Sequence, residues 1–174
     1  MDRSSTKRLS FDAMLAAMCA VLGYVSLDLG NLKITFESVP VLIGALIFGP
    51  ADGAAVAFVG TLLYQLLRYG VSATTLLWIL PYVLCGVLVG IYARRRDFML
   101  SQRQMICTVI TNELLITTLN TVVLYIDSKA YGYYSAMFIF GSLTLRVVIC
   151  VAKAVVYSLA LPPLLRALRK EAAA

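Results

Sequence analysis

ITFESVPVLIGALIFGPADG, residues 34–53, begins like an extended loop, becomes strongly apolar after Pro40 and stops at Gly49-Pro50. Its apolar run is about half of the roughly 20 residues that a transmembrane helix needs. Long apolar segments nevertheless flank it on both sides. We therefore expect a short second transmembrane helix that ends at Phe48-Gly49-Pro50 and follows a long outer loop.

The composition of the chain indicates an integral membrane protein. Its 174 residues are 61% hydrophobic and only 14% charged, whereas about 25% of residues are charged in an average soluble domain. So few polar residues could not cover the surface of a soluble domain. The length fits a single transmembrane domain over residues 1–174.

Six apolar segments predict the fold class. They cover approximately residues 9–27, 39–48, 53–67, 74–92, 105–125 and 138–165, the last ending near Pro162-Pro163. In lipid, each segment must satisfy its own backbone hydrogen bonds, so these segments are expected to be helices. The predicted fold is an all-α integral membrane protein with six transmembrane helices in a compact bundle.

The basic residues predict the orientation of this bundle. They concentrate in the N-terminal tail, in the loop of residues 94–103 and in the C-terminal tail after residue 165. By the positive-inside rule, both termini are expected to be cytoplasmic. Membrane topology thus accounts for the net charge of +6. We expect the protein to lie in a lipid bilayer and not to bind nucleic acid.

The sequence lacks the residues and motifs that metal binding, ATP hydrolysis and serine hydrolysis usually need. The sequence contains no His, and its four Cys are scattered among apolar runs, so we expect no metal site and no cofactor. It contains no phosphate-binding G-x-x-x-x-G-K-[ST] sequence and no G-x-S-x-G. An enzyme is therefore not expected, although a small membrane-embedded enzyme and a stand-alone transporter remain alternatives.

Among the ionisable residues inside the predicted helices, Glu113, Arg146 and Lys153 are functional candidates. Glu113 and Lys153 should lie at similar depth and could form a structural ion pair. Arg146 is about two turns nearer the outer face and is the better candidate for binding a carboxylate.

Other polar and aromatic residues near the outer face could bind a ligand or serve structural purposes. Gln65 and Asn120 could contact ligand or join helices, whereas Arg68 could reach the membrane interface. Trp78 and Tyr131 could stack on an aromatic ligand or anchor the interface. The polar stretch from Lys33 to Glu37 is a possible gate.

The order of these parts resembles the substrate-binding S component of energy-coupling factor (ECF) vitamin transporters. Three stretches carry the resemblance, which covers nearly the whole chain: Ala13-x-x-x-Ala17, VPVLIGALIFGPADGAAVAFVG (residues 39–60) and SATTLLWILPYVLCGVLVGIY (residues 72–92). The closest branch is the folate type. Its Phe-Pro-Gly-Phe-Thr stretch is here VSATTLLW, so only Thr74 or Thr75 corresponds.

The resemblance implies a high-affinity capture subunit for a water-soluble vitamin or precursor, with folate as the first choice. Another vitamin or a nucleobase-like precursor, such as pantothenate or a pyrimidine, is the alternative. The implied partners are an ECF transmembrane subunit, which would dock on Ala13 and Ala17, and two ABC ATPases. The predicted substrate-binding residues are Lys33, Glu37, Gln65, Arg68, Thr74, Thr75, Trp78, Asn120, Tyr125, Tyr131 and Arg146.

Overall fold

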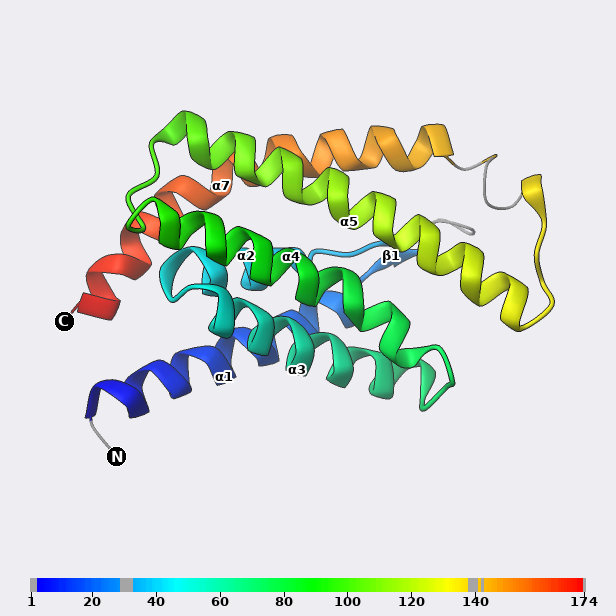
Figure 1. Cartoon of the computed structure of the whole chain (residues 1–174), viewed down its shortest axis with the longest axis horizontal. Coiled ribbons are helices and arrows are strands. Elements are labelled where there is room, and N and C mark those ends of the chain that lie inside the picture. Colours follow the sequence, from blue (N-terminus) through cyan, green and yellow to red (C-terminus); the bar gives the residue numbers. More distant parts are fainter. Residues whose placement is uncertain (1–2, 29–32, 138–140, 142, 174) are drawn as a thin grey trace.

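The structure is a computed structural model that describes residues 3–28, 33–137, 141 and 143–173 (Figure 1). Within this part of the chain six helices form a bundle, which confirms the predicted all-α fold. The helices are α1 (Arg3–Tyr24), α2 (Ser38–Ile47), α3 (Pro50–Tyr69), α4 (Thr75–Arg95), α5 (Gln102–Ala130) and α7 (Leu143–Ala173). Two short antiparallel strands, β1 (Leu27–Asp28) and β2 (Lys33–Ile34), lie in the connection between α1 and α2.

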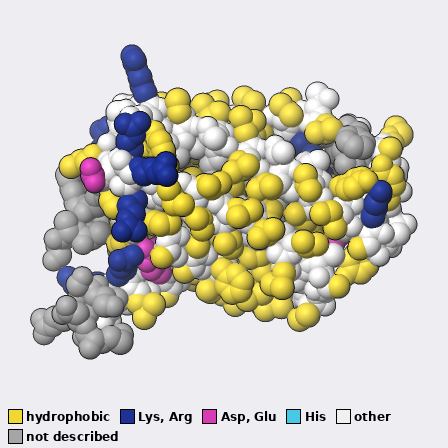
Figure 2. Space-filling view, in the orientation of Figure 1, with side chains coloured by type: hydrophobic (Ala, Val, Ile, Leu, Met, Phe, Trp, Pro, Cys, Tyr) yellow, Lys and Arg dark blue, Asp and Glu magenta, His cyan; other side chains and the backbone are white. Residues whose placement is uncertain are grey.

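Four of the described helices, α3, α4, α5 and α7, are long and apolar enough to cross a membrane. Hydrophobic side chains cover most of the visible face of the molecule, whereas Lys and Arg gather at one end (Figure 2). The two ends of the chain also lie at that end (Figure 1). An apolar surface with basic residues gathered at one end is typical of a membrane protein.

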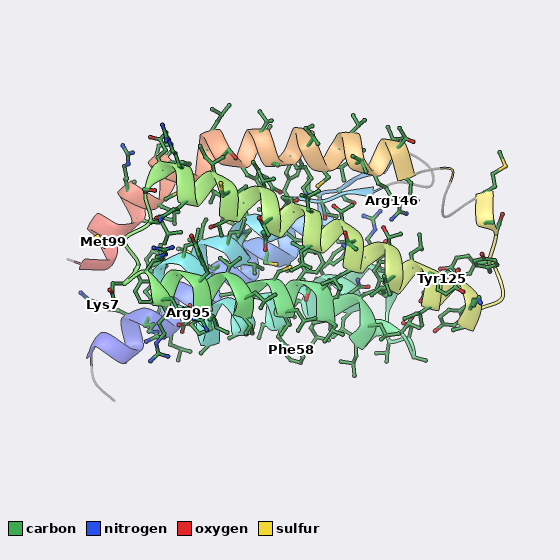
Figure 3. All side chains as sticks on the ribbon, turned by 45° about the horizontal axis from the view of Figure 1, so that its top comes forward. Lys7, Phe58, Arg95, Met99, Tyr125 and Arg146 are labelled. Carbon is green, nitrogen blue, oxygen red and sulfur yellow. The ribbon has the colours of Figure 1, made fainter. Side chains whose placement is uncertain are left out.

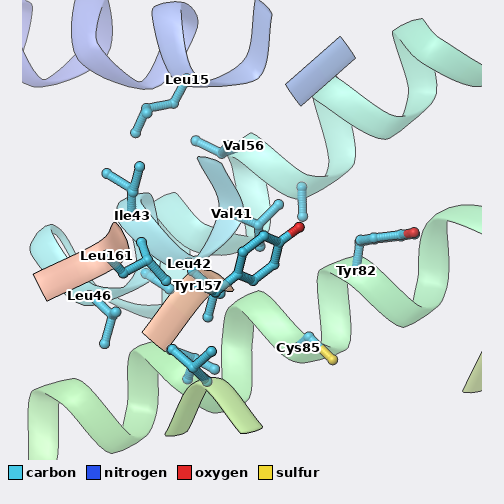
Figure 4. Close-up of a cluster of buried hydrophobic side chains, with 14 of the residues drawn as sticks. Leu15, Val41, Leu42, Ile43, Leu46, Val56, Tyr82, Cys85, Tyr157 and Leu161 are labelled. Atoms are coloured by element: carbon cyan, nitrogen blue, oxygen red, sulfur yellow. The ribbon is translucent and has the colours of Figure 1, made fainter. Parts of the chain in front are cut away.

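Helix α2 lies in the centre of the bundle. Its ten residues make a helix about 15 Å long, roughly half the thickness of the hydrocarbon core. Val41, Ile43 and Leu46 are buried in a cluster with Leu15 of α1 and Leu161 of α7 (Figure 4). The short apolar run is therefore a core helix, enclosed by the longer helices.

The turn between α2 and α3 explains why α2 stops where the sequence predicts. Gly49 has a φ of +105°, a conformation that L side chains rarely adopt, and Pro50 opens α3 at its first turn. Proline is favoured there because its missing N–H has no partner at the start of a helix. The chain can thus reverse direction within two residues.

Helices α3 and α4 approach closely along a seam of glycines. A Cβ added to Gly86 would lie 2.6 Å from the carbonyl oxygen of Gly53, and one added to Gly53 would lie 2.7 Å from the Cβ of Ala45. No side chain fits between these backbones. Small residues permit such close packing in membrane helices, where dispersion contacts carry much of the association energy.

The last helix differs from the prediction at its C-terminal end. The sequence predicts an end near Pro162-Pro163, but α7 continues through both prolines to Ala173. Each proline removes one backbone hydrogen bond, and the helix bends in this region (Figure 1). The basic C-terminal turns therefore remain helical beyond the apolar segment.

Candidate functional site

A cavity of about 480 Å³ lies inside the half of the bundle away from the chain ends. Such a volume is typical of pockets that enclose a small organic molecule. Helices α3, α4, α5 and α7 contribute to its wall, together with the segment before α2 and the connections after α3 and α5. Its lining residues are Thr35, Glu37, Tyr64, Gln65, Tyr69, Ser72, Thr74, Trp78, Tyr82, Ile116, Thr117, Asn120, Leu124, Asp127, Tyr131, Tyr133, Arg146, Ile149, Cys150 and Lys153.

The structure brings most of the predicted binding residues to this cavity. Those that line it are Glu37, Gln65, Thr74, Trp78, Asn120, Tyr131 and Arg146. Residues from four helices and three connections thus converge on one space. Their role in binding stays a prediction.

Three other predicted residues do not line the cavity. Arg68 donates to the carbonyl oxygen of Tyr24 at 3.1 Å. Thr75 accepts a hydrogen bond from the backbone N–H of Ser72 at 2.9 Å. Tyr125 of α5 packs edge-on against Tyr134 of the α5–α7 connection, with ring centroids 5.6 Å apart. The side chain of Lys33 lies outside the described part of the structure.

One wall of the cavity is rich in hydrogen-bond acceptors. The Glu37 side chain is buried, and its Oε1 accepts from Thr35 Oγ1 at 3.0 Å. The hydroxyl of Tyr82 interacts with both of these residues and accepts from Asn120 Nδ2 at 3.4 Å. We call Thr35, Glu37, Tyr82 and Asn120 the acceptor wall.

The acceptor wall reaches the backbone of α1. A Cβ added to Gly23 would lie 2.9 Å from Glu37 Oε2 and 2.8 Å from the ring of Tyr64. The C-terminal turn of α1 therefore packs directly against two side chains that line the cavity.

Asp127 connects two elements over the cavity, a role that the sequence analysis did not assign to it. Its Oδ1 accepts from Trp78 Nε1 of α4 at 3.4 Å, and its Oδ2 accepts from the hydroxyl of Tyr133 in the α5–α7 connection. Burial, together with this bond to Asp127, raises the pKa of Tyr133 above its ordinary value. The phenol therefore keeps its proton and donates a hydrogen bond to the carboxylate. An acidic residue in the last turn of an apolar helix is the sequence signal that could have identified Asp127.

Two of the intramembrane ionisable residues form an ion pair, and both Lys153 of this pair and Arg146 line the cavity. Lys153 Nζ lies 2.8 Å from Glu113 Oε2, and the Glu113 carboxylate is almost completely buried. Arg146 lines the cavity and is half-buried. It lies near the start of α7, at the opposite end of the bundle from Lys7 and Arg95 (Figure 3). Arg146 is thus placed at a distance from the basic end of the bundle.

On α1 the structure leaves Ala13 and Ala17 exposed, whereas Leu15, Ala16 and Cys19 are buried against the bundle. The predicted docking residues thus lie on the outward face of this helix.

Among the residues that the structure describes, no three His, Cys, Asp or Glu side chains gather in an arrangement that could hold a metal ion.

Two comparisons with known proteins agree on a family and a fold. The family described as "ECF transporter, substrate-specific component" matches residues 7–165. The S-component for biotin from an ECF-type ABC transporter, a crystal structure, superposes with a TM-score of 0.71 at 16% sequence identity. That match covers 98% of this chain and 94% of the other. None of the curated proteins compared with the chain matches it.

Proposed function

Because this chain belongs to the family of ECF transporter substrate-specific components, we propose that it captures a water-soluble vitamin at the outer face of a bacterial cytoplasmic membrane. Folate is the first candidate. The observation that supports this most directly is the cavity of about 480 Å³, with its charged, polar and aromatic lining, inside an apolar helical bundle. Ionisable and polar groups are costly within a bilayer, so a cavity lined by them indicates a polar ligand.

The chemistry of the cavity favours a ligand that is both aromatic and anionic. Trp78, Tyr82 and Tyr131 supply ring surfaces, and Arg146 supplies a planar cation suited to a carboxylate. Folate combines aromatic rings with carboxylates. Biotin, named for the structural neighbour, and pantothenate each carry one carboxylate and are its competitors.

The single tryptophan of the chain provides a direct binding assay. Trp78 lines the cavity, so we expect an aromatic vitamin to change its fluorescence at low concentration. The purified protein is titrated with folate, biotin and pantothenate, and molecules that copurify are released by denaturation and identified by mass spectrometry. If no vitamin binds or copurifies, the proposal is wrong.

Arg146→Ala tests the contact with an anionic group. Removing one partner of a buried, charge-paired contact costs about 2–5 kcal/mol, so affinity should fall more than about tenfold. Arg103→Ala, which changes an exposed arginine at the other end of the bundle, is the matched control and should bind normally. Equal affinities of both variants would remove Arg146 from the site.

The proposed partners are an ECF transmembrane subunit and two ABC ATPases, and both termini would face the cytoplasm. Ala13→Trp or Ala17→Trp would prevent close approach of a partner helix to α1 and should abolish uptake while vitamin binding persists. Ala55→Trp, at an exposed alanine of α3, is the control for added bulk. If the α1 variants take up vitamin normally, the docking face lies elsewhere.

A further inference from the structure

The acceptor wall contains two acceptors that a ligand with N–H groups could engage. The first is the carboxylate of Glu37, which is only 3% exposed. Each carboxylate oxygen has two lone pairs, so Glu37 can accept further hydrogen bonds beside its contacts with Thr35 and the Tyr82 hydroxyl. Burying a carboxylate is costly unless hydrogen bonds compensate it.

The second acceptor is the side-chain oxygen of Asn120. Because Asn120 Nδ2 donates to the Tyr82 hydroxyl, the amide oxygen is left to accept. This Oδ1 atom is buried and has no hydrogen-bond partner among the described residues. A buried acceptor without a donor costs about 1–3 kcal/mol, so a ligand that supplies an N–H here would gain affinity.

We propose that the acceptor wall binds the N–H edge of a planar heterocycle in which an amino group stands beside a ring N–H. Such an edge donates two parallel hydrogen bonds, the geometry that a carboxylate accepts most favourably. Glu37 receives this pair, and Asn120 Oδ1 receives a further N–H of the ligand. The inference rests on the proposed vitamin capture and adds to it the chemical class of the ligand: an aminopyrimidinone-type ring.

The rest of the cavity is compatible with this assignment. The ring of Tyr82 belongs to the acceptor wall, and Trp78 lies one helical turn away on α4. Both can provide a surface for a flat ring. Arg146 lies on a different helix, α7, so an anionic substituent of the same ligand would have a separate contact.

The test uses the full chain in detergent and two small probes of nearly equal shape. Pterin carries the amino group beside a ring N–H, whereas in lumazine an oxo group replaces the amino group. We expect pterin to bind at least about tenfold more tightly than lumazine, since a site built to accept hydrogen bonds from the ligand's N–H groups rejects an analogue that lacks one of them. Equal affinities, or no measurable binding of pterin, would overturn the proposal.

Glu37→Gln then assigns the discrimination to one residue. Gln has nearly the shape of Glu but replaces one acceptor oxygen by a donor, so the preference for pterin should fall below about threefold. Asp97→Asn, an exposed acid in the α4–α5 connection, should keep the full preference. A preference that persists in Glu37→Gln contradicts the assignment. The comparison of probes on the unmodified chain stands whether or not this variant folds.

Folate is measured in the same series, so the two proposals can fail separately. Pterin preference without folate binding would keep the acceptor wall and remove folate as the transported vitamin. Folate binding without pterin preference would keep folate and overturn the role of the acceptor wall.

Discussion

Removing one partner of the Glu113–Lys153 pair should strongly destabilise the bundle. Lys153→Met would take away the cation 2.8 Å from Glu113 Oε2 and leave a carboxylate whose side chain is only 1% exposed. Breaking a buried pair from one side costs about 3–5 kcal/mol, which lowers the ratio of folded to unfolded protein by roughly two to four orders of magnitude. Glu113→Gln should be destabilising as well, since it leaves the ammonium without its counter-ion.

The double variant Glu113→Gln/Lys153→Met should recover most of the loss. Replacing both partners of a buried pair is often neutral, because neither charge is then left without compensation. We therefore expect the double variant to lie within about 1 kcal/mol of the unmodified protein.

The assay is a double-mutant cycle on the free energy of unfolding, measured by titrating the protein in mild detergent with a denaturing detergent. Arg103→Met changes an exposed cation and should shift this free energy by less than about 0.5 kcal/mol. If the losses of the two single variants simply add in the double variant, the side chains do not interact energetically. The ion pair would then contribute nothing to stability.

Three further predictions concern packing and the cavity. Gly53→Ala forces a Cβ to within 2.9 Å of a backbone oxygen of α4 and should lower the melting temperature. Gly70→Ala meets no neighbouring atom, and only its φ of +71° strains an alanine there, so it should lower the melting temperature less; equal shifts would show that the close approach of α3 and α4 does not limit stability. Gly23→Ala should weaken vitamin binding several-fold in the fluorescence titration, because the new methyl group displaces Glu37; unchanged affinity would show that the carboxylate position is irrelevant. Tyr133→Phe removes the hydroxyl that anchors the α5–α7 connection and should speed vitamin dissociation in a stopped-flow experiment; an unchanged rate would show that this bond does not hold the cavity closed.

The sequence predicts the helices of this fold well because membrane-spanning segments are long, apolar and separated by charged or glycine-containing turns. It also predicts that Glu113 and Lys153 share a depth, since helical rise converts residue number into height. The continuation of α7 was missed because prolines usually end helices, whereas here the chain bends and remains helical.

The composition of the site was harder to predict. In a soluble helix, hydrophobic periodicity separates the inner face from the outer one. In a membrane helix, lipid-facing and core-facing residues are both apolar, so the pattern does not reveal which face of α4 bears Tyr82. The residues that were predicted stand out by charge or polarity, as Arg146 and Asn120 do. Tyr64 and Tyr82 required the three-dimensional arrangement.

The contact at Gly23 places α1 directly behind Glu37 and Tyr64, two side chains that line the cavity. If α1 is also where a partner docks, one helix takes part in two binding equilibria, and each must then influence the other. Thermodynamic linkage requires that the factor by which the partner changes vitamin affinity equals the factor by which the vitamin changes partner affinity. Because Gly23 has no side chain, α1 lies in direct contact with Glu37 and Tyr64. A change in these two residues on vitamin binding would therefore reach α1, and the partner could distinguish a loaded subunit from an empty one.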